Sequence, residues 1–109
     1  IKSLNLYNTE IMANYATNLF YANTECEKDL DRIEKFLSDN FFTCYSMREE
    51  EFIDAKFESK WEYPSELIDG LIKSLDEPNK VYIRVLSHEL ANEYVSFRIY
   101  SQGEWEIRY

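Results

Sequence analysis

The spacing of apolar residues changes repeatedly along this chain, between the period of about two that suits a β-strand and the period of about 3.6 that suits a helix. Residues 16–22 are rich in β-favouring types, and the stretch that follows repeats its apolar residues at helical intervals: Cys26, Leu30, Ile33 and Leu37. A sequence with both periods must form both kinds of element. The chain is therefore predicted to be an α+β protein.

The first half predicts a strand, a helix and two further strands. Thr24 and Glu27 have the spacing of a capping box, so the helix is expected to begin there and to run to about Asn40. Two strands are expected over residues 42–47 and from Phe52 onward, joined in a hairpin by the acidic link 48–51. One side of the second strand of this hairpin should carry Ile53, Ala55, Phe57, Ser59 and Trp61.

The second half predicts a helix followed by three strands. Pro64 suits a first helical turn, and residues 76–79 should end the helix. Strands are expected from Val81 and, after a polar break over residues 88–92, from Val95, with a turn at 101–104 before the last strand. The apolar stripe of this helix consists of Leu67, Ile68, Leu71, Ile72 and Leu75.

This element order favours a ferredoxin-like split βαβ antiparallel sheet, with both helices on one face and an added C-terminal β-hairpin. The length of 109 residues suits one domain, which we expect over residues 16–109. Residues 1–15 are expected to be a leader or an irregular N-terminal segment, with Met12 as a candidate natural start.

Charge is the most unusual property of the composition. The chain has 21 Asp and Glu residues against 12 Lys and Arg, which gives a net charge of −9. Such a chain repels nucleic acid and anionic membranes, so the expected partner is a basic protein. Because no apolar run is long enough to span a bilayer and no signal peptide is recognisable, a cytoplasmic protein with two reduced structural cysteines is expected.

Carboxylates and tyrosines are the candidate partner-binding residues. Carboxylates on one surface can replace phosphates in contacts with Lys and Arg, and tyrosines are enriched in protein interfaces. A purely stabilising or solubilising role for the acidic residues is the alternative. The candidates are Asp29, Asp31 and Glu34 in the first helix, Glu49, Glu50 and Glu51 in the acidic link, and Tyr82, Tyr94 and Tyr100 in the late strands.

No pattern in the sequence predicts catalysis, a cofactor or a metal site. Two weaker alternatives stay open. Cys44 and His88, with Glu89, could form a nucleophile–base set if the fold brought them together, and Glu49–Glu51 could bind a hard cation. The expected function is therefore binding rather than enzymatic.

Four short segments share a pattern with a known family: Met12-Ala13-Asn14-Tyr15, Thr17-Asn18-Leu19, Phe57-Glu58-Ser59-Lys60-Trp61-Glu62-Tyr63-Pro64, and Tyr94-Val95-Ser96-Phe97 with Gly103. In these segments the chain resembles a family of small phage-associated domains, the Api-type domains. The resemblance spans residues 12–109, and it implies a ferredoxin-like fold and a setting on a phage or mobile element, with no catalytic residues.

Two functional hypotheses follow. The first is an inhibitor of the anti-CRISPR or anti-restriction type, which blocks a basic nucleic-acid-binding surface with carboxylates. The second is an immunity protein or complex subunit that neutralises a basic toxin or partner. A plain structural domain is the remaining alternative, since an acidic surface also favours solubility.

Overall fold

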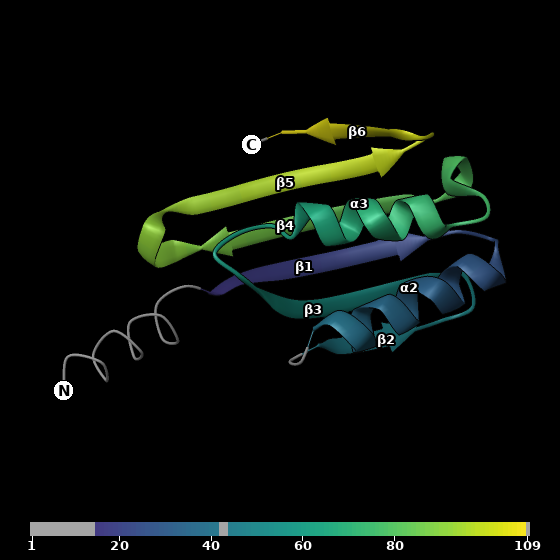
Figure 1. Ribbon diagram of the computed structural model, residues 1–109, viewed down its shortest axis with the longest axis horizontal. Helices are drawn as coiled ribbons and strands as arrows, with labels where there is room; N and C mark the ends of the chain where they lie inside the picture. The colour runs from purple at the N-terminus through teal and green to yellow at the C-terminus, as the bar shows by residue number, and fades with distance from the viewer. Residues whose placement is uncertain (1–14, 42–43, 109) are drawn as a thin grey trace.

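The computed structural model describes residues 15–41 and 44–108 of the chain (Figure 1). These residues form an α+β fold with a six-stranded antiparallel sheet and two helices. The helices are α2 (Glu27–Asn40) and α3 (Ser65–Ser74), and the 3-10 turns are η1 (Pro78–Lys80) and η2 (Leu90–Asn92). The strands are β1 (Tyr15–Asn23), β2 (Tyr45–Arg48), β3 (Phe52–Lys60), β4 (Tyr82–Glu89), β5 (Tyr94–Ser101) and β6 (Glu104–Ile107).

The strands lie in the order β2-β3-β1-β4-β5-β6, so the first described strand is in the interior of the sheet. On β1, Phe20 lies opposite Ala55 of β3 on one side and Val85 of β4 on the other. Strand β1 thereby joins the β2–β3 hairpin to the three C-terminal strands. The two predicted hairpins, β2–β3 and β5–β6, are both present.

Both helices lie on the same face of the sheet, as Figure 1 shows. The hydrophobic core fills the space between this face and the helices. Each buried Leu, Ile or Phe side chain stabilises the fold by about 1.5–3 kcal/mol relative to its exposed state. The core includes Phe20, Ile53, Phe57, Ile83 and Val85 from the sheet, Leu30, Ile33 and Leu37 from α2, and Ile68 and Leu71 from α3.

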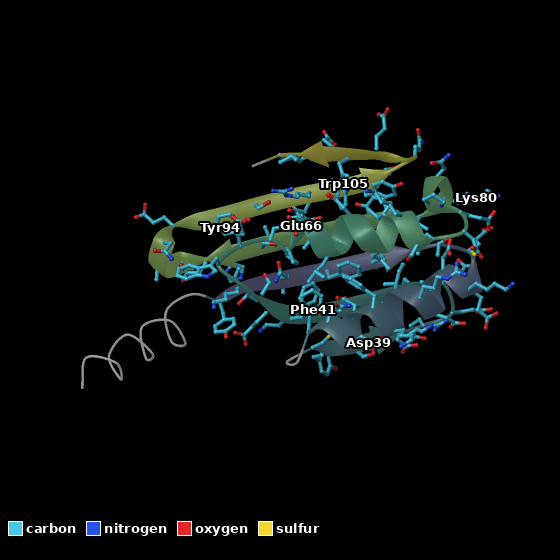
Figure 2. The ribbon with its side chains drawn as sticks, in the orientation of Figure 1. Asp39, Phe41, Glu66, Lys80, Tyr94 and Trp105 are labelled. Atoms are coloured by element: carbon cyan, nitrogen blue, oxygen red, sulfur yellow. The ribbon has the colours of Figure 1, made fainter. Side chains whose placement is uncertain are left out.

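The β5–β6 hairpin extends this core beyond the helices. Trp105 of β6 lies against Tyr100 of β5 and against Tyr63, with ring centroids 5.2 Å and 6.2 Å apart (Figure 2). The hairpin turn places Gln102 and Gly103 at positive φ. The positive φ favours glycine at position 103. A Cβ atom there would also lie 2.5 Å from the Asn79 side chain, because the turn lies close to η1.

The start of α2 differs from the sequence prediction. No capping box forms, because Thr24 is buried in the link between β1 and α2, and its Oγ1 accepts a hydrogen bond of 3.1 Å from the amide of Cys26 instead. The N-cap is Cys26, which makes no side-chain cap. The predicted end of the helix at Asn40 is confirmed.

Three strand predictions need correction. Trp61 does not continue the buried side of β3, because the strand ends at Lys60 and Trp61 turns outward with a φ of 72° and is 51% exposed. Strand β2 begins at Tyr45, and the expected residues 42–43 lie outside the described residues. The polar break begins later than predicted, since His88 and Glu89 still belong to β4.

Within the described part of the chain, neither helix is long and apolar enough to cross a membrane.

Candidate protein-binding surfaces

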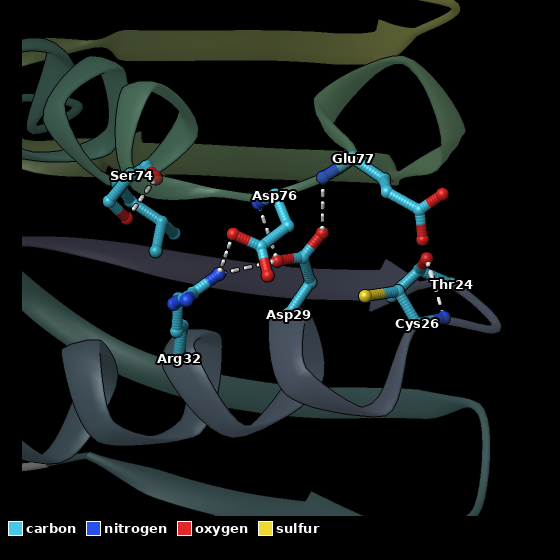
Figure 3. Close-up of polar contacts among 8 residues, drawn as sticks. Thr24, Cys26, Asp29, Arg32, Ser74, Asp76 and Glu77 are labelled. Carbon is cyan, nitrogen blue, oxygen red and sulfur yellow. Dashed lines mark hydrogen bonds and ion pairs between the residues drawn. The ribbon is translucent and has the colours of Figure 1, made fainter.

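Asp29, one of the expected partner-binding acids, is fully buried (Figure 3). Its carboxylate accepts hydrogen bonds of 2.8 Å and 2.9 Å from the amides of Asp76 and Glu77, and it forms a 3.1 Å salt bridge with Arg32. Burial raises the pKa of Asp29, but these amide hydrogen bonds and the contacts with Cys26 and Arg32 outweigh it, so the pKa lies below its ordinary value. Asp29 therefore fastens α2 to the segment after α3 and is not displayed on the surface.

Asp31 and Glu34 are exposed on α2, but Arg48 neutralises much of their charge. Arg48 Nη1 lies 2.5 Å from Asp31 Oδ1 and 2.9 Å from Glu34 Oε1. The arginine comes from the last position of β2, so these contacts also fix the edge strand against the helix. The acidic side of α2 is consequently less available to a partner than its sequence indicates.

Glu49–Glu51 form the exposed turn between β2 and β3. A 2.9 Å hydrogen bond from the Glu49 amide to the Phe52 carbonyl closes the turn, and a 3.0 Å hydrogen bond from the Thr24 amide to the Glu51 carbonyl attaches it to the segment before α2. The three carboxylates are therefore held on a backbone that is anchored at two points.

Further exposed carboxylates lie at the same end of the molecule, near Lys80 in Figure 2. An open depression here is lined by Glu25, Glu51, Glu77 and Lys80. Lys80 forms a 3.1 Å salt bridge with Glu77, whereas no salt bridge within the described ranges involves the other glutamates of this end. We call this region the acidic end, and it consists of Glu25, Glu27, Glu49, Glu50, Glu51 and Glu77.

The three candidate tyrosines lie on two different faces. Tyr82 is on the sheet face away from the helices, where its ring lies 6.2 Å from that of Tyr21. Tyr100 is only 4% exposed and belongs to the core, and the Tyr94 hydroxyl accepts a 3.0 Å hydrogen bond from the amide of Tyr63 on the helix side. Tyr94 and Tyr100 therefore pack within the fold, and only Tyr82 lies on an uncovered surface.

The sheet face away from the helices was not singled out by the sequence. No described element covers it, and it carries apolar side chains from five strands. Leu19, Met47 and Val95 on it are between 43% and 46% exposed, and Tyr45 is 73% exposed. We call it the open face, and its apolar members are Tyr15, Leu19, Tyr21, Tyr45, Met47, Phe52, Tyr82, Leu86, Val95, Phe97 and Ile99.

A signal for the open face was present in the sequence. Strand β1 has apolar residues at consecutive positions, Leu19, Phe20, Tyr21 and Ala22, as does β5 at Ile99 and Tyr100. A strand that faces solvent on one side alternates apolar and polar residues, whereas a strand buried on both sides does not. The segments 19–22 and 99–100 therefore carry apolar side chains on both faces, as strands that are covered on both faces do.

Next to the acidic end, the open face carries an aromatic cluster with a cation. The Tyr21 ring stacks on Phe52 at 5.6 Å, and the Arg84 guanidinium lies 4.2 Å from the centre of the Tyr21 ring. Elsewhere on this face, charges of both signs follow β3, where Asp54, Lys56, Glu58 and Lys60 alternate in sign. The open face thus differs from the acidic end in having nearly balanced charge.

The alternative catalytic set does not come together. His88 lies on the open face, whereas Cys44 packs against the core on the helix side. The Glu89 carboxylate accepts hydrogen bonds from the amides of Ala91 and Asn92, and burial raises the pKa of the Cys44 thiol, which disfavours a thiolate. Among the residues that the structure describes, no group of three His, Cys, Asp or Glu side chains could hold a metal ion.

No protein-family model, curated protein or solved structure matches this chain. Its function is therefore inferred from the two surfaces described above. The acidic end presents six carboxylates, of which Glu77 forms a salt bridge with Lys80, and the open face presents apolar side chains with charges of both signs.

Proposed function

We propose that this protein is a small, acidic, non-catalytic binding protein that occupies a basic surface of another protein with its acidic end. The observation that carries this proposal is the convergence of carboxylates from three separate segments on anchored backbone. Glu51 is tied to Thr24, and Glu77 is tied to Asp29. Carboxylates fixed in this way bind Lys and Arg without first losing backbone freedom, and opposite potentials speed the encounter.

We propose a partner that normally binds nucleic acid, since spaced carboxylates can take the place of phosphates at Lys and Arg side chains. The protein would then act as an inhibitor of the anti-CRISPR or anti-restriction type, encoded by a phage or mobile element and active in the cytoplasm. The resemblance to Api-type domains supports this setting. The structure of α2 refines the binding set, because Asp29 is internal and Asp31 and Glu34 are bound to Arg48.

We also propose that strands β1 to β4 and the two helices form a ferredoxin-like split βαβ unit. The position of both helices on one face and the antiparallel order β2-β3-β1-β4 support this assignment. The six-strand order differs from the four strands of that unit, because β5 and β6 extend the sheet beyond β4. The added strands supply part of the open face.

A second candidate function, an immunity protein or complex subunit, is favoured by the open face. An exposed surface with several large apolar residues is typical of protein contact sites. In that function, a toxin or neighbouring subunit would bind the sheet rather than the acidic end. The two candidates therefore predict different effects for substitutions at these two surfaces.

The test is affinity capture from host-cell extract with the full chain and two charge variants. The triple variant Glu49→Gln, Glu50→Gln, Glu51→Gln removes three charges from the acidic end. Its control, Glu62→Gln, Glu66→Gln, Asp69→Asn, removes three exposed charges from the region of α3. We expect the unchanged chain and the control to capture a basic nucleic-acid-binding protein at low salt, and the acidic-end variant to lose it.

Two further measurements complete this test. Capture should weaken as salt rises, because ionic strength screens contacts between exposed charges. The captured protein should also lose its nucleic acid when this chain is added. Equal capture by the two triple variants would rule out the acidic end as the binding surface, and loss of capture on substituting Leu19 would instead favour the second candidate.

A further inference from the structure

The open face is large enough for a stable protein interface. Four of its strands have eight or nine residues and two have four. At about 3.3 Å per residue and about 4.8 Å between strands, these strands span roughly 650 Å². Stable interfaces bury about 600–1,000 Å² on each partner, so this face alone reaches the usual size.

The distribution of charge indicates which partner suits this face. The open face carries Asp54, Glu58, Glu104 and Glu106 against Lys56, Lys60 and Arg84, so it shares little of the net charge of −9. The uncompensated acids lie at the acidic end, which is the surface that attracts a basic partner. A partner for the open face should itself be apolar with charges of both signs.

A second copy of this chain has these properties, and the charges on β3 fit it in detail. Along the open face, β3 has the order Asp54, Lys56, Glu58, Lys60, which alternates negative and positive. A two-fold axis across the strands, halfway between Lys56 and Glu58, places each copy's β3 antiparallel over the other. Lys56 of one copy then lies over Glu58 of the other, and Asp54 over Lys60, so each of the four charges on β3 meets the opposite sign.

The same two-fold axis also sets the pairs on the neighbouring strands, and one of these pairs, Phe97 with Val95, is apolar on both sides. The registers place Leu19, Leu86 and Phe97 in the cross-strand row of Lys56. The row of Glu58 contains Thr17, His88 and Val95. Under this axis Leu19 lies over Thr17 of the second copy, and Phe97 lies over Val95. In such an isologous interface each contact occurs twice, which doubles its contribution.

We propose that the open face binds the open face of a second copy, so that the protein is a two-fold symmetric dimer with its sheets stacked and its helices outside. Aligned sheets pack about 10 Å apart and cross at an angle of about 30°. Because this angle separates the strands away from the centre, the residue pairs described above apply to the rows next to the two-fold axis. The two helical layers, with Asp31, Glu34 and Asp39 on α2, then face away from each other. This proposal is independent of the proposed inhibitor function, which uses the acidic end, but it competes with the second candidate function for the same face.

The first test measures molar mass by sedimentation over a dilution series of the full chain. Leu19→Glu places a charge in the centre of the interface, and Leu67→Glu is its matched control, because both leucines are 43% exposed but Leu67 lies on α3. We expect dimers for the unchanged chain and the control. Burial of a carboxylate in the centre of the interface, where it also competes with Glu58 of the second copy for Lys56, should weaken dimerisation of Leu19→Glu by about tenfold or more.

The second test uses the symmetry of β3. Lys56→Glu should weaken the dimer, because the new carboxylate lies over Glu58 of the second copy. The double variant Lys56→Glu, Glu58→Lys reverses the pair and should restore dimerisation, since opposite signs again meet. Lys73→Glu on α3 is the control with the same change in net charge. Circular dichroism and thermal melts check that every variant is folded.

Salt separates this surface from the acidic end. Dimerisation should persist or strengthen at high salt, because screening reduces repulsion between two copies of charge −9. The Glu49–Glu51 glutamine variant should still dimerise, whatever the fate of the proposed function. A monomer at all concentrations and salts, equal effects of Leu19→Glu and Leu67→Glu, or a double variant without recovery would each overturn the proposal. The proposal would also be overturned if the unchanged chain were a monomer and Leu19→Glu abolished its capture of a different protein, because the open face would then bind that protein.

Discussion

At the scale of single residues, the fold depends on polar side chains that are buried but fully bonded. Asn18 is inaccessible to solvent. Its side-chain Nδ2 donates a 2.8 Å hydrogen bond to Ser59 Oγ, and its Oδ1 accepts a 2.5 Å hydrogen bond from Ser87 Oγ. These bonds connect β1 with β3 and β4 inside the sheet. Asp29 has the same function between α2 and the segment that precedes η1. Loss of one partner leaves the others unsatisfied, which is why such groups are costly to replace.

Asp29→Asn is expected to lower the free energy of unfolding by about 2 kcal/mol at pH 7, since a charge-assisted acceptor of two amides and one guanidinium is lost. The pKa of Asp29 is lower in the folded protein than its ordinary value of about 3.9, so its stabilisation is complete above that pH and is lost as pH falls further. The difference in unfolding free energy between the unchanged chain and Asp29→Asn should therefore be smaller near pH 3 than at pH 7. Urea unfolding at pH 3 and at pH 7 measures this difference.

The control for this prediction is Asp69→Asn, which removes an exposed carboxylate from α3. It should change the unfolding free energy by less than about 0.5 kcal/mol at either pH. A difference between Asp29→Asn and the unchanged chain that is as large at pH 3 as at pH 7 would contradict the ionised role of Asp29.

At the scale of elements, the edge strand β2 is fixed by an ion-pair network rather than by burial. Its residues 45–47 are exposed, and its last residue, Arg48, contacts two carboxylates of α2. The opposite edge, β6, is fixed differently, through the packing of Trp105 on Tyr100. The two edges should therefore respond differently to loss of charge.

Arg48→Gln is expected to destabilise the protein by about 0.5–1 kcal/mol, because one guanidinium joins two carboxylates and is itself mostly covered. The matched control is Arg108→Gln, whose salt bridge with Glu106 is exposed on both sides and should contribute almost nothing. Chemical denaturation compares the two. Equal stability of the two variants would contradict this account. Because Asp31 and Glu34 lose their cation, Arg48→Gln should also bind a basic partner more tightly.

The sequence predicted the elements well and their relations less well. Hydrophobic periods alone placed Leu30, Ile33 and Leu37 in the core and Glu49–Glu51 in an exposed turn, because both depend on local spacing. The burial of Asp29 was out of reach, since it depends on amides 47 and 48 residues away. The separation of Tyr82 from Tyr100 was likewise not predictable, because the face that each residue occupies follows from strand register and not from alternation.

At the scale of the whole molecule, the net charge of −9 opposes the compact state by self-repulsion. The described salt bridges reduce this repulsion on α2, but the acidic end retains it. Added salt should therefore raise the stability of the free protein, whereas it should weaken binding to a basic partner. The salt dependence of stability can be measured on the free protein.

The melting temperature is expected to rise by a few degrees between about 0.01 M and about 0.3 M sodium chloride, as the Debye length falls from about 30 Å to below 8 Å. The variant with glutamine at residues 49–51 should melt at a higher temperature in low salt and should gain less from added salt. Thermal melts at low protein concentration measure both effects. An identical salt response in the two proteins would show that repulsion at the acidic end is negligible.

The interior position of β1 has a consequence for synthesis of the chain. This strand leaves the ribosome before the other described strands, yet its two neighbours, β3 and β4, are made about 30 and 60 residues later. The hydrogen-bonding groups of β1 are therefore fully paired only after β4 has been made. The sheet closes through contacts between distant segments, which makes folding slow. Until β4 appears, the nascent chain exposes one unpaired side of its most apolar strand.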